Sequence, residues 1–433
     1  MLCKIVNAGR QGNSRNDHRK TLMDTGVPSI SHQNMAPHHR PPLLTAHRRQ
    51  PVSRVITVRH SAFAALAVMV VLLTGTVHSV ATGNQAPSFD TAKPGYRYAF
   101  PKDHGAHERF RTEWWYYTGH LTAAGGRQFG FELTFFRRGI PPEQVRTHPS
   151  QWSIQQLYLA HFALTDLEGN RFLFADKLSR EGLGKAGAET DRLHVWLDRW
   201  SAAMDDPASS RQRLQAATDA FAIDLQVIPR KPPVLHGREG ISRKGTRPEQ
   251  ASHYYSYTHL STEGDIRIGT DTFSVTGLSW MDHEFGSADL GRDVVGWDWF
   301  SLQLSDSTEL MWYSLRRADG SADPVSSGTL ISADGRTQPL NAQDLTIEPL
   351  SYWTSPRSKA KYPQQWRITA PSMGINLDVR ALLADQELNT ARSTRVTYWE
   401  GAVSATGQAR GAAVTGRGYV ELTGYAERFT QRL

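Results

Sequence analysis

The hydrophobic and polar residues of this chain alternate over many short segments, a period of two that is typical of half-buried β-strands. The clearest case is segment 112–121 followed by segment 127–137, with a glycine-containing turn at 123–126 between them. The apolar face of the second segment consists of Phe129, Phe131, Leu133 and Phe135. The pattern therefore predicts a β-hairpin with one apolar side.

Similar segments continue to the end of the chain, separated by turn-forming residues. They predict strands at 155–165, 171–174, 193–200, 221–228, 254–260, from 266 onward, 297–304, 310–317, 328–332, 366–369, 375–382, 397–403 and 419–425. A helix is expected only at 211–220. Many short strands at this spacing predict an all-β chain of antiparallel sandwiches or barrels. The length of 433 residues favours two globular units.

The charge of the chain is concentrated at its N-terminus. Residues 1–60 hold ten Lys and Arg against two Asp and Glu, and residues 61–81 hold none of either. Removing these from the totals of 49 and 42 leaves 39 basic and 40 acidic side chains. Because the rest of the chain is nearly neutral, we expect no nucleic-acid partner.

The apolar run 62–77 follows basic residues and precedes small residues that end at Ala81. This pattern predicts a signal peptide cleaved after Ala81, so we expect 1–81 to be a disordered basic leader plus signal peptide and 82–100 to be a linker. The mature protein is then secreted or periplasmic; an uncleaved membrane anchor is the alternative. The only cysteine, Cys3, is lost with the leader. The mature chain therefore has no disulfide, thiol nucleophile or cysteine metal ligand.

Candidate acid and base groups concentrate in the stretch 278–304. If its first half is a strand, Asp282 shares a face with Trp280, and His283 points to the opposite face. Asp282 and His283 then cannot both point into one cavity without a bulge.

The second half of this stretch places Trp297 and Trp299 on one face and Asp298 on the other, in line with Phe300. If the face of Asp298 is buried, desolvation raises the pKa of its carboxyl group and makes it a general acid near neutral pH. Alternatively, Asp298 lies near a strand start, where it caps a turn or pairs with Arg292.

Two other expected strands carry aromatic side chains with polar tips. Trp114 and Tyr116 share one face of the first, and Tyr255 and Tyr257 share one face of the other. Such faces suit either a packed core or an internal cavity that binds a ligand.

Other known site patterns are weak or missing. His104, His107 and Glu108 resemble a metal-binding set, but no helix aligns the two imidazoles, and we expect no metal site. The sequence has no G-x-S-x-G motif, no P-loop and no dinucleotide-binding fingerprint. These absences argue against a common serine hydrolase, phosphoryl transfer and cofactor redox chemistry, so we expect no cofactor.

Four motifs together resemble those of a secreted lipocalin-like family: R-T-E-W-W-Y-Y-T-G-H-L, Y-Y-S-Y-T-H-L, S-W-M-D-H-E-F-G and G-W-D-W-F. That family includes carotenoid 1,2-hydratase, also called hydroxyneurosporene synthase, and proteins labelled predicted secreted hydrolases. The resemblance covers most of the chain after about residue 95. It implies two lipocalin-like antiparallel β-barrel domains packed together, one at 101–288 and one at 289–433.

The hydratases of this family add water to a carbon-carbon double bond without a cofactor, so the resemblance implies a cofactor-independent hydro-lyase. Its Asp-His pair corresponds to Asp282 and His283, and Asp298 is a third catalytic candidate. Asp282 or Asp298 would donate the proton, and His283 would position or deprotonate the water. The indoles expected to stabilise a cation belong to Trp280, Trp297 and Trp299.

The expected partner is a small apolar ligand, isoprenoid or lipid-like. The residues expected to contact it are Trp280, Trp297, Trp299, Tyr255, Tyr257, Trp114 and Tyr116. A non-catalytic lipid carrier and a secreted hydrolase remain alternatives, because a fold does not fix a chemistry. Association with the membrane surface or with a membrane transport system is a further expectation.

Overall fold

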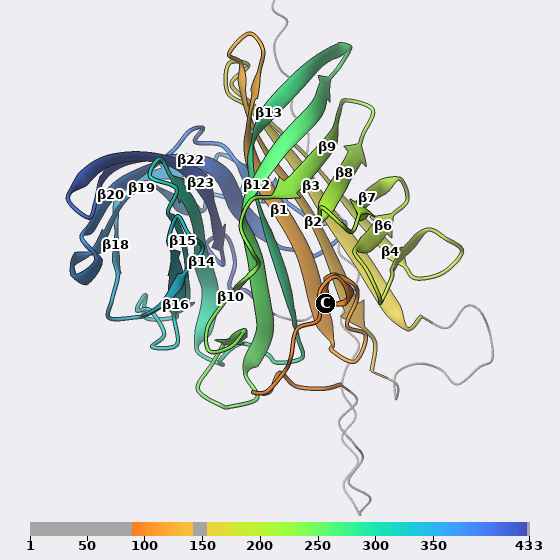
Figure 1. Ribbon diagram of the computed structural model, residues 1–433, viewed down its shortest axis with the longest axis horizontal. Helices are drawn as coiled ribbons and strands as arrows, with labels where there is room; N and C mark the ends of the chain where they lie inside the picture. The colour runs from red at the N-terminus through yellow and green to blue at the C-terminus, as the bar shows by residue number, and fades with distance from the viewer. Residues whose placement is uncertain (1–88, 142–153, 431–433) are drawn as a thin grey trace, which may run out of the picture. The chain divides into compact units, whose positions relative to one another are not determined.

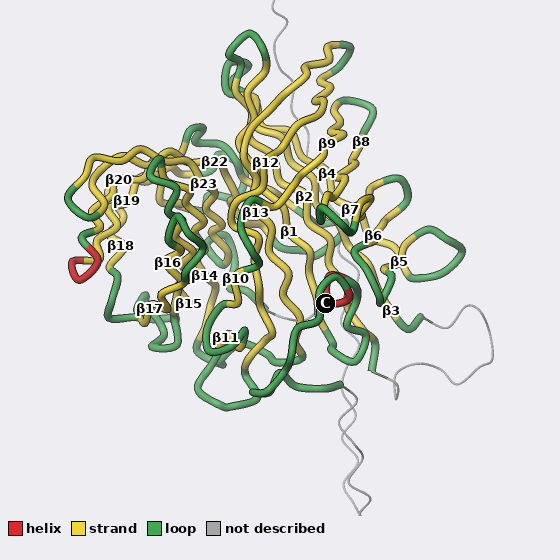
Figure 2. The backbone as a smooth tube through the Cα atoms, in the orientation of Figure 1, coloured by secondary structure: helices red, strands yellow, loops and turns green. Residues whose placement is uncertain are grey.

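The computed structural model describes residues 89–141 and 154–430. The expected signal peptide with its cleavage site at Ala81, and most of the first half of the linker, lie outside the described residues. The described residues belong to one compact unit and consist mainly of strands, with two short 3-10 turns, η1 (Lys102–His104) and η2 (Pro371–Met373) (Figure 2). None of the described helical turns is long and apolar enough to cross a membrane. The prediction of an all-β chain is confirmed.

Two curled antiparallel sheets make up the fold (Figure 1). The first has the strand order β4-β3-β2-β1-β13-β12-β9-β8-β7-β6-β5, with β10 and β11 paired to β12. Its strands are β1 (Thr112–Ala123), β2 (Gln128–Gly139), β3 (Gln156–Asp166), β4 (Arg171–Arg180), β5 (Ala186–Ala188), β6 (His194–Leu197), β7 (Trp200–Asp206), β8 (Arg211–Ala217), β9 (Phe221–Pro229), β10 (Val234–Leu235), β11 (Ile241–Arg243), β12 (Ala251–Ile268) and β13 (Asp271–Gly286).

The second sheet has the order β17-β16-β15-β14-β23-β22-β20-β19-β18, with β21 paired to β22. Its strands are β14 (Val294–Leu304), β15 (Glu309–Arg317), β16 (Ser327–Ile331), β17 (Thr337–Asn341), β18 (Thr346–Thr354), β19 (Lys361–Ala370), β20 (Ile375–Ala381), β21 (Glu387–Asn389), β22 (Thr397–Ala409) and β23 (Ala412–Thr423). The expected boundary after residue 288 lies in the connection between β13 and β14. The architecture is the lipocalin-like one expected from the sequence.

The helix predicted at 211–220 is wrong, because Arg211–Ala217 forms strand β8. Its buried residues alternate strictly, with Gln212, Leu214 and Ala216 inside and their neighbours more exposed. The strand pairs with β7 and β9 on its two sides. Tertiary pairing therefore overrides a sequence whose Arg, Gln, Leu and Ala residues favour a helix in isolation.

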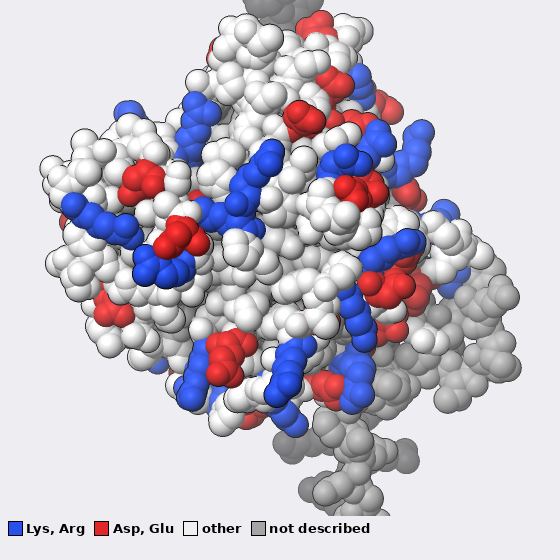
Figure 3. Space-filling model, viewed as in Figure 1, with Lys and Arg blue, Asp and Glu red and all other residues white. Residues whose placement is uncertain are grey.

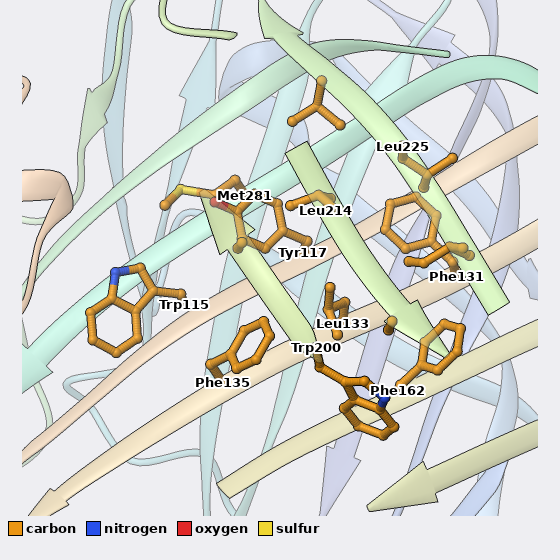
Figure 4. Packing of buried hydrophobic residues seen from close by; sticks show 14 of the residues in the cluster. Trp115, Tyr117, Phe131, Leu133, Phe135, Phe162, Trp200, Leu214, Leu225 and Met281 are labelled. Atoms are coloured by element: carbon orange, nitrogen blue, oxygen red, sulfur yellow. The ribbon is translucent and has the colours of Figure 1, made fainter. Parts of the chain in front are cut away.

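The concave face of the first sheet encloses an aromatic core (Figure 4). Trp115 and Tyr117 of β1 point into this core together with Met281 of β13. The sheet curls so that its two ends approach each other: Lys177 of β4 lies 4.5 Å from the ring centre of Trp200 at the start of β7. The odd-numbered side chains of β1 and β13 therefore point into the interior of the first barrel.

In the view of Figure 3, basic and acidic side chains are interspersed over the surface. Many form exposed pairs, such as Arg213 with Asp224 and Arg367 with Asp378. Exposed pairs of this kind contribute little to stability, about 0–1 kcal/mol each.

Candidate active site

The candidate site begins with the alternation of side chains along β13. Met281 packs in the core of the first barrel, whereas Trp280 packs in a separate cluster between the two sheets. Asp282 and Glu284 face the same side as Trp280, and both line a cavity. His283 points to the opposite side, as the sequence predicts for a regular strand.

A cavity of about 250 Å³ lies between the outer face of β1, β2, β3, β12 and β13 and the facing strands β14, β22 and β23. This volume is well above the space that one water molecule needs. Aromatic and aliphatic side chains form much of its wall, including Trp114, Phe136, Leu159 and Trp299. Carboxyl groups interrupt this apolar lining at a few places. The combination is typical of a small-molecule site.

Strand register aligns the polar groups of the first sheet in one row. His161 lies opposite Thr134, Thr134 opposite Tyr116, and Tyr116 opposite Asp282. Ser256 of β12 then lies opposite Asp282 and completes the row. Side chains in neighbouring strands at matched positions share a face, so these strands present the groups on one side of the sheet.

The facing sheet contributes a second row. Glu400 of β22 lies directly opposite Glu421 of β23, and Glu421 lies opposite Trp299 of β14. Like charges at directly paired positions destabilise a sheet. Two glutamates in this arrangement are therefore expected to keep at least one proton at neutral pH.

Asp282 is 5% exposed and has a hydrogen bond for each of its oxygens. Its Oδ2 accepts from the Tyr254 hydroxyl at 2.6 Å, and its Oδ1 accepts from Trp280 Nε1 at 2.6 Å and from the hydroxyl of Ser256. Burial raises the pKa of Asp282 to about 7, although these three donors oppose the rise. Asp282 is thus close to half protonated at neutral pH.

Tyr254 joins Asp282 to the aromatic wall. Trp299 Nε1 donates to the Tyr254 hydroxyl at 3.1 Å. Burial and the nearby Asp282 raise the pKa of Tyr254 well above its usual value, so the phenol keeps its proton. Beside it, Lys244 Nζ lies 2.9 Å from Glu284 Oε1 and 4.3 Å from the ring centre of Tyr313. Lys244 is therefore the counter-ion of Glu284.

Glu132 of β2 also lines the cavity. Its Oε1 accepts from Thr134 Oγ1 at 2.8 Å and from the Tyr398 hydroxyl at 3.4 Å. Its Oε2 is buried and has no hydrogen-bond partner among the described residues. Burial raises the pKa of Glu132 to about 8, and it raises the pKa of Glu400 well above its usual range. Nearby, His161 Nδ1 forms a hydrogen bond of 2.7 Å with the Tyr398 hydroxyl, and burial lowers the pKa of His161 to about 3.

His283 belongs to a separate polar network inside the first barrel. Its Nε2 lies 2.8 Å from Glu113 Oε1, and its Nδ1 lies 2.9 Å from the Tyr255 hydroxyl. Tyr255 in turn contacts His104 Nδ1 at 2.6 Å. Arg137 Nε donates to Glu113 Oε2 at 2.9 Å, and both side chains are fully buried. This network connects β1, β2, β12 and β13 on the side away from Asp282.

One group of described residues has the spacing of metal ligands: His107, Glu113 and His283. These three side chains already bond to one another, since Glu113 Oε1 lies 2.7 Å from His107 Nδ1 and 2.8 Å from His283 Nε2. Arg137 also places a positive charge on the same carboxylate. These contacts describe a closed hydrogen-bond network that fits an ion poorly.

Asp298 lies away from the cavity lining. Its Oδ2 accepts from the Tyr425 hydroxyl at 3.0 Å, and its Oδ1 pairs with Arg316. The alternative interpretation of the sequence pairs Asp298 with Arg292 or has it cap a turn, whereas its basic partner in the structure is Arg316. Burial raises the pKa of Asp298, partly offset by Arg316.

The structure separates the residues that the sequence singles out. The cavity lining includes Trp114, Tyr116, Asp282, Trp297 and Trp299. Trp280 is not among the lining residues, but its Nε1 donates to Asp282 Oδ1 at the cavity wall. The side chains of His283, Tyr255 and Tyr257 belong to the interior of the first barrel.

Several cavity residues were not singled out from the sequence, namely Glu132, His161, Lys244, Tyr254, Tyr398, Glu400 and Glu421. Alternation along β12 is enough to identify Tyr254, because its side chain points to the face opposite that of Tyr255 and Tyr257. The glutamates sit on β2, β22 and β23, whose proximity depends on how the two sheets pack. No local pattern in the sequence marks them.

Comparison with solved structures supports this architecture. A protein assigned as an AttH from Nitrosomonas europaea is 34% identical, with a TM-score of 0.70, and the match covers 78% of this chain and all of that one. Kievitone hydratase from Nectria haematococca is 16% identical, with a TM-score of 0.60, and the match covers 78% of this chain and 97% of that one. At this identity the second match shows a shared fold alone.

No curated protein matches the sequence. A family model described as AttH-like matches residues 91–425, which include all strands of both sheets. Together with the solved relative, this match agrees with the lipocalin-like family resemblance carried by the sequence motifs. The chain belongs to the AttH-like family.

Proposed function

We propose that this protein binds an apolar, isoprenoid or lipid-like ligand in the cavity between its two sheets and adds water to a carbon-carbon double bond of that ligand. The observation that carries the proposal is Asp282, a buried carboxyl group at the cavity wall whose pKa of about 7 leaves it protonated in a large fraction of molecules. Acid catalysis of this kind needs a proton donor that survives at neutral pH.

The surroundings of Asp282 fit the role of a proton donor to carbon. Its carboxyl group lies among aromatic side chains, so water competes weakly for the proton. Tyr254 and Trp280 fix the orientation of the two oxygens through bonds of 2.6 Å. A fixed carboxyl group protonates a bound double bond without first reorganising.

The reaction balances with Asp282 as the only group that changes protonation state. The carboxylic acid gives its proton to one alkene carbon, and the other carbon becomes a carbocation. A water molecule in the cavity attacks this cation through its oxygen, and the proton that the water loses returns to the Asp282 carboxylate. Trp299 lines the cavity, and its ring face is suited to stabilise the cation.

The roles expected for His283 and Asp298 change in this proposal. His283 faces the first barrel, where it bonds to Glu113 and Tyr255. Asp298 is held by Arg316 and Tyr425, outside the cavity lining. We assign both to holding the strands that carry Asp282 and Trp299 in place.

A non-catalytic carrier is the second candidate. The observation that favours it is the aromatic wall formed by Trp114, Trp297 and Trp299, which binds an apolar molecule without any chemical step. A carrier tolerates the loss of Asp282 but loses affinity when these indoles are truncated. A hydrolase has less support, because the one metal-like group among the described residues is closed by its own hydrogen bonds.

The test is to incubate the protein with an apolar lipid extract in water enriched in heavy oxygen and to analyse the products by mass spectrometry. Hydration predicts a product heavier than its precursor by one whole labelled water. A ligand that is bound and released unchanged would support the carrier instead. A cleaved product that carries labelled oxygen would support the hydrolase.

Export of the protein, with contact to a membrane surface or a membrane transport system, remains a proposal. It rests on the apolar run at 62–77 and the small residues before position 82. N-terminal sequencing of the protein recovered from its source tests it. A chain that starts at Thr82 supports a cleaved signal peptide, and a chain that retains the apolar run contradicts it.

A further inference from the structure

Three glutamates line one part of the cavity without a basic partner. Glu132 comes from the first sheet, and Glu400 and Glu421 come from the second. Glu132 is 1% exposed and Glu400 is 2% exposed. Among the described residues, no lysine or arginine forms an ion pair with any of the three. By contrast, Glu284 in the same cavity has Lys244 at 2.9 Å.

The hydrogen bonds of this group are incomplete in one specific place. Glu132 Oε1 has two donors, Thr134 and Tyr398, but its Oε2 is buried without any partner among the described residues. Buried carboxyl oxygens are almost always bonded in folded proteins. A ligand in the cavity can therefore supply the hydrogen-bond donor that Glu132 Oε2 lacks.

The same three groups repel one another. Glu400 and Glu421 occupy directly paired positions on neighbouring strands. Glu132 and Glu421 both contribute to raising the pKa of Glu400, after burial itself. Ionising these carboxyl groups together is therefore unfavourable. A positive charge placed among them offsets the repulsion and favours their ionised forms.

Aromatic rings complete the surroundings of the glutamates. The Tyr116 hydroxyl bonds to Glu400, and the Tyr398 hydroxyl lies 3.4 Å from Glu132. Trp299 lies opposite Glu421 in the sheet. Carboxylates together with aromatic faces are the groups that bind organic ammonium ions, by charge and by cation–π contact.

We propose that Glu132, Glu400 and Glu421 form a subsite for the ammonium group of an amphiphilic amine, whose apolar part lies along Trp114 and Trp299. The ligand class is therefore a long-chain or polycyclic molecule with one basic nitrogen. The inference rests on the proposed function only in taking this cavity as the ligand site. It does not require that the ligand be hydrated.

A divalent metal ion fits this group less well than an ammonium ion. Calcium and magnesium need several oxygens within about 2.0–2.6 Å of one point. In the described residues, the only three candidate ligands with atoms all within 4.8 Å of one another are His107, Glu113 and His283. The oxygens of the three cavity glutamates are spread more widely, which leaves room for a larger organic cation.

Paired probes of equal length test the inference directly. Octylamine and 1-octanol present the same chain and differ in the charged group, and binding is followed by the fluorescence of the cavity tryptophans or by calorimetry. We expect octylamine to bind about tenfold more tightly than octanol, because a charged hydrogen bond and a cation–π contact each contribute on this scale. Octanol that binds as tightly as octylamine, or more tightly, would overturn the inference.

Variants assign the preference to these side chains. Glu132→Gln keeps the shape of the side chain and removes its ability to ionise beside a bound ammonium group, and it should abolish most of the preference for octylamine while leaving octanol affinity unchanged. Glu421→Gln is the second variant and keeps the test valid if Glu132→Gln does not fold. Glu348→Gln removes one exposed carboxylate from β18 and controls for net charge. A preference that survives in both cavity variants contradicts the subsite.

The remaining outcomes separate this inference from the proposed function. Calcium or magnesium that binds and displaces octylamine would overturn the ammonium subsite. If both probes bind equally and the wild-type protein still hydrates a component of the lipid extract, the ammonium inference fails and the proposed function stands. If octylamine is preferred and no hydration occurs, the subsite stands and the proposed reaction fails.

Discussion

Asp282 and His283 are neighbours in the chain, and their side chains end in two different compartments. Asp282 contacts Tyr254, Trp280 and Ser256 beside the cavity between the sheets. His283 contacts Glu113 and Tyr255 inside the first barrel. The acid and the imidazole therefore cannot act on the same ligand atom. Asp282 is available for chemistry in the cavity, whereas His283 is available for holding the strands of the first barrel together.

The protonation of Asp282 gives the reaction a pH dependence. Burial raises the pKa of Asp282 to about 7, and the acid form is the one that donates. The rate of hydration should be highest below that pH and fall about tenfold for each pH unit well above it. Steady-state rates measured between about pH 5 and pH 9 check this. A rate that rises through pH 7 would contradict a protonated Asp282.

The same pH profile should respond to Tyr254. Its hydroxyl donates to Asp282 Oδ2 and so lowers the pKa of that carboxyl group. Tyr254→Phe removes the bond and keeps the ring, so the pKa of Asp282 should rise and the descending limb should move to higher pH. The neighbouring titratable groups are Glu284, Lys244 and Glu400, and all three remain in the variant. An unshifted limb would show that another group controls the profile.

The raised pKa of Glu132 links folding stability to pH. In the unfolded chain Glu132 loses its proton near its ordinary pKa of 4.5, whereas in the folded protein it retains the proton to about pH 8. The folded state binds more protons in this window, so the free energy of unfolding falls as pH rises from about 5 to about 8, by on the order of 2–4 kcal/mol.

Glu132→Gln should reduce this fall, because the amide does not ionise. Urea unfolding at several pH values, in wild type and variant, measures the difference. Buried histidines such as His161 also change stability over part of this range, but they are present in both proteins and drop out of the comparison. Parallel curves for the two proteins would show that Glu132 ionises normally in the fold.

The network around His283 should contribute to stability more than to chemistry. Glu113 is fully buried, and its charge is balanced by Arg137 at 2.9 Å. Glu113→Gln leaves the buried guanidinium without its counter-ion, and we expect a loss of about 3–5 kcal/mol in the free energy of unfolding. Urea unfolding checks the loss, with the exposed Glu348→Gln variant as control. A change as small as that of the control would show that the network is dispensable.

Local alternation predicts much of what the structure shows. The period of two in 112–121 and 127–137 gives the β1–β2 hairpin, and the same rule places Asp282 and His283 on opposite faces. It also places Trp299 and Phe300 on opposite faces of β14, and Phe300 packs in the core of the second sheet. These predictions hold because the direction of a side chain on a strand depends on the backbone of that strand alone.

The rest depends on pairings that no local pattern records. Glu132 and Tyr398 contact each other across 266 positions of sequence. Which face of β12 meets the cavity, and so whether Tyr254 or Tyr255 lines it, follows from how the two sheets pack. The strand at 211–217 is decided in the same way, by its partners β7 and β9. These contacts are tertiary, and the secondary-structure propensities of the individual residues do not predict them.

The most direct test of the account compares two Asp→Asn variants from the same stretch of chain. Asp282→Asn removes the proposed proton donor, and Asp298→Asn changes a half-buried aspartate that lies outside the cavity lining. Incorporation of labelled water into the lipid-extract product and binding of the unreacted ligand are measured for both variants and for wild type.

The account predicts that Asp282→Asn lowers the hydration rate by about 10²–10⁴-fold and changes ligand affinity by less than about threefold. Asp298→Asn should retain hydration close to the wild-type rate in the molecules that fold. If the Asp282→Asn protein hydrates the ligand as fast as wild type, Asp282 is not the acid and the central claim is wrong.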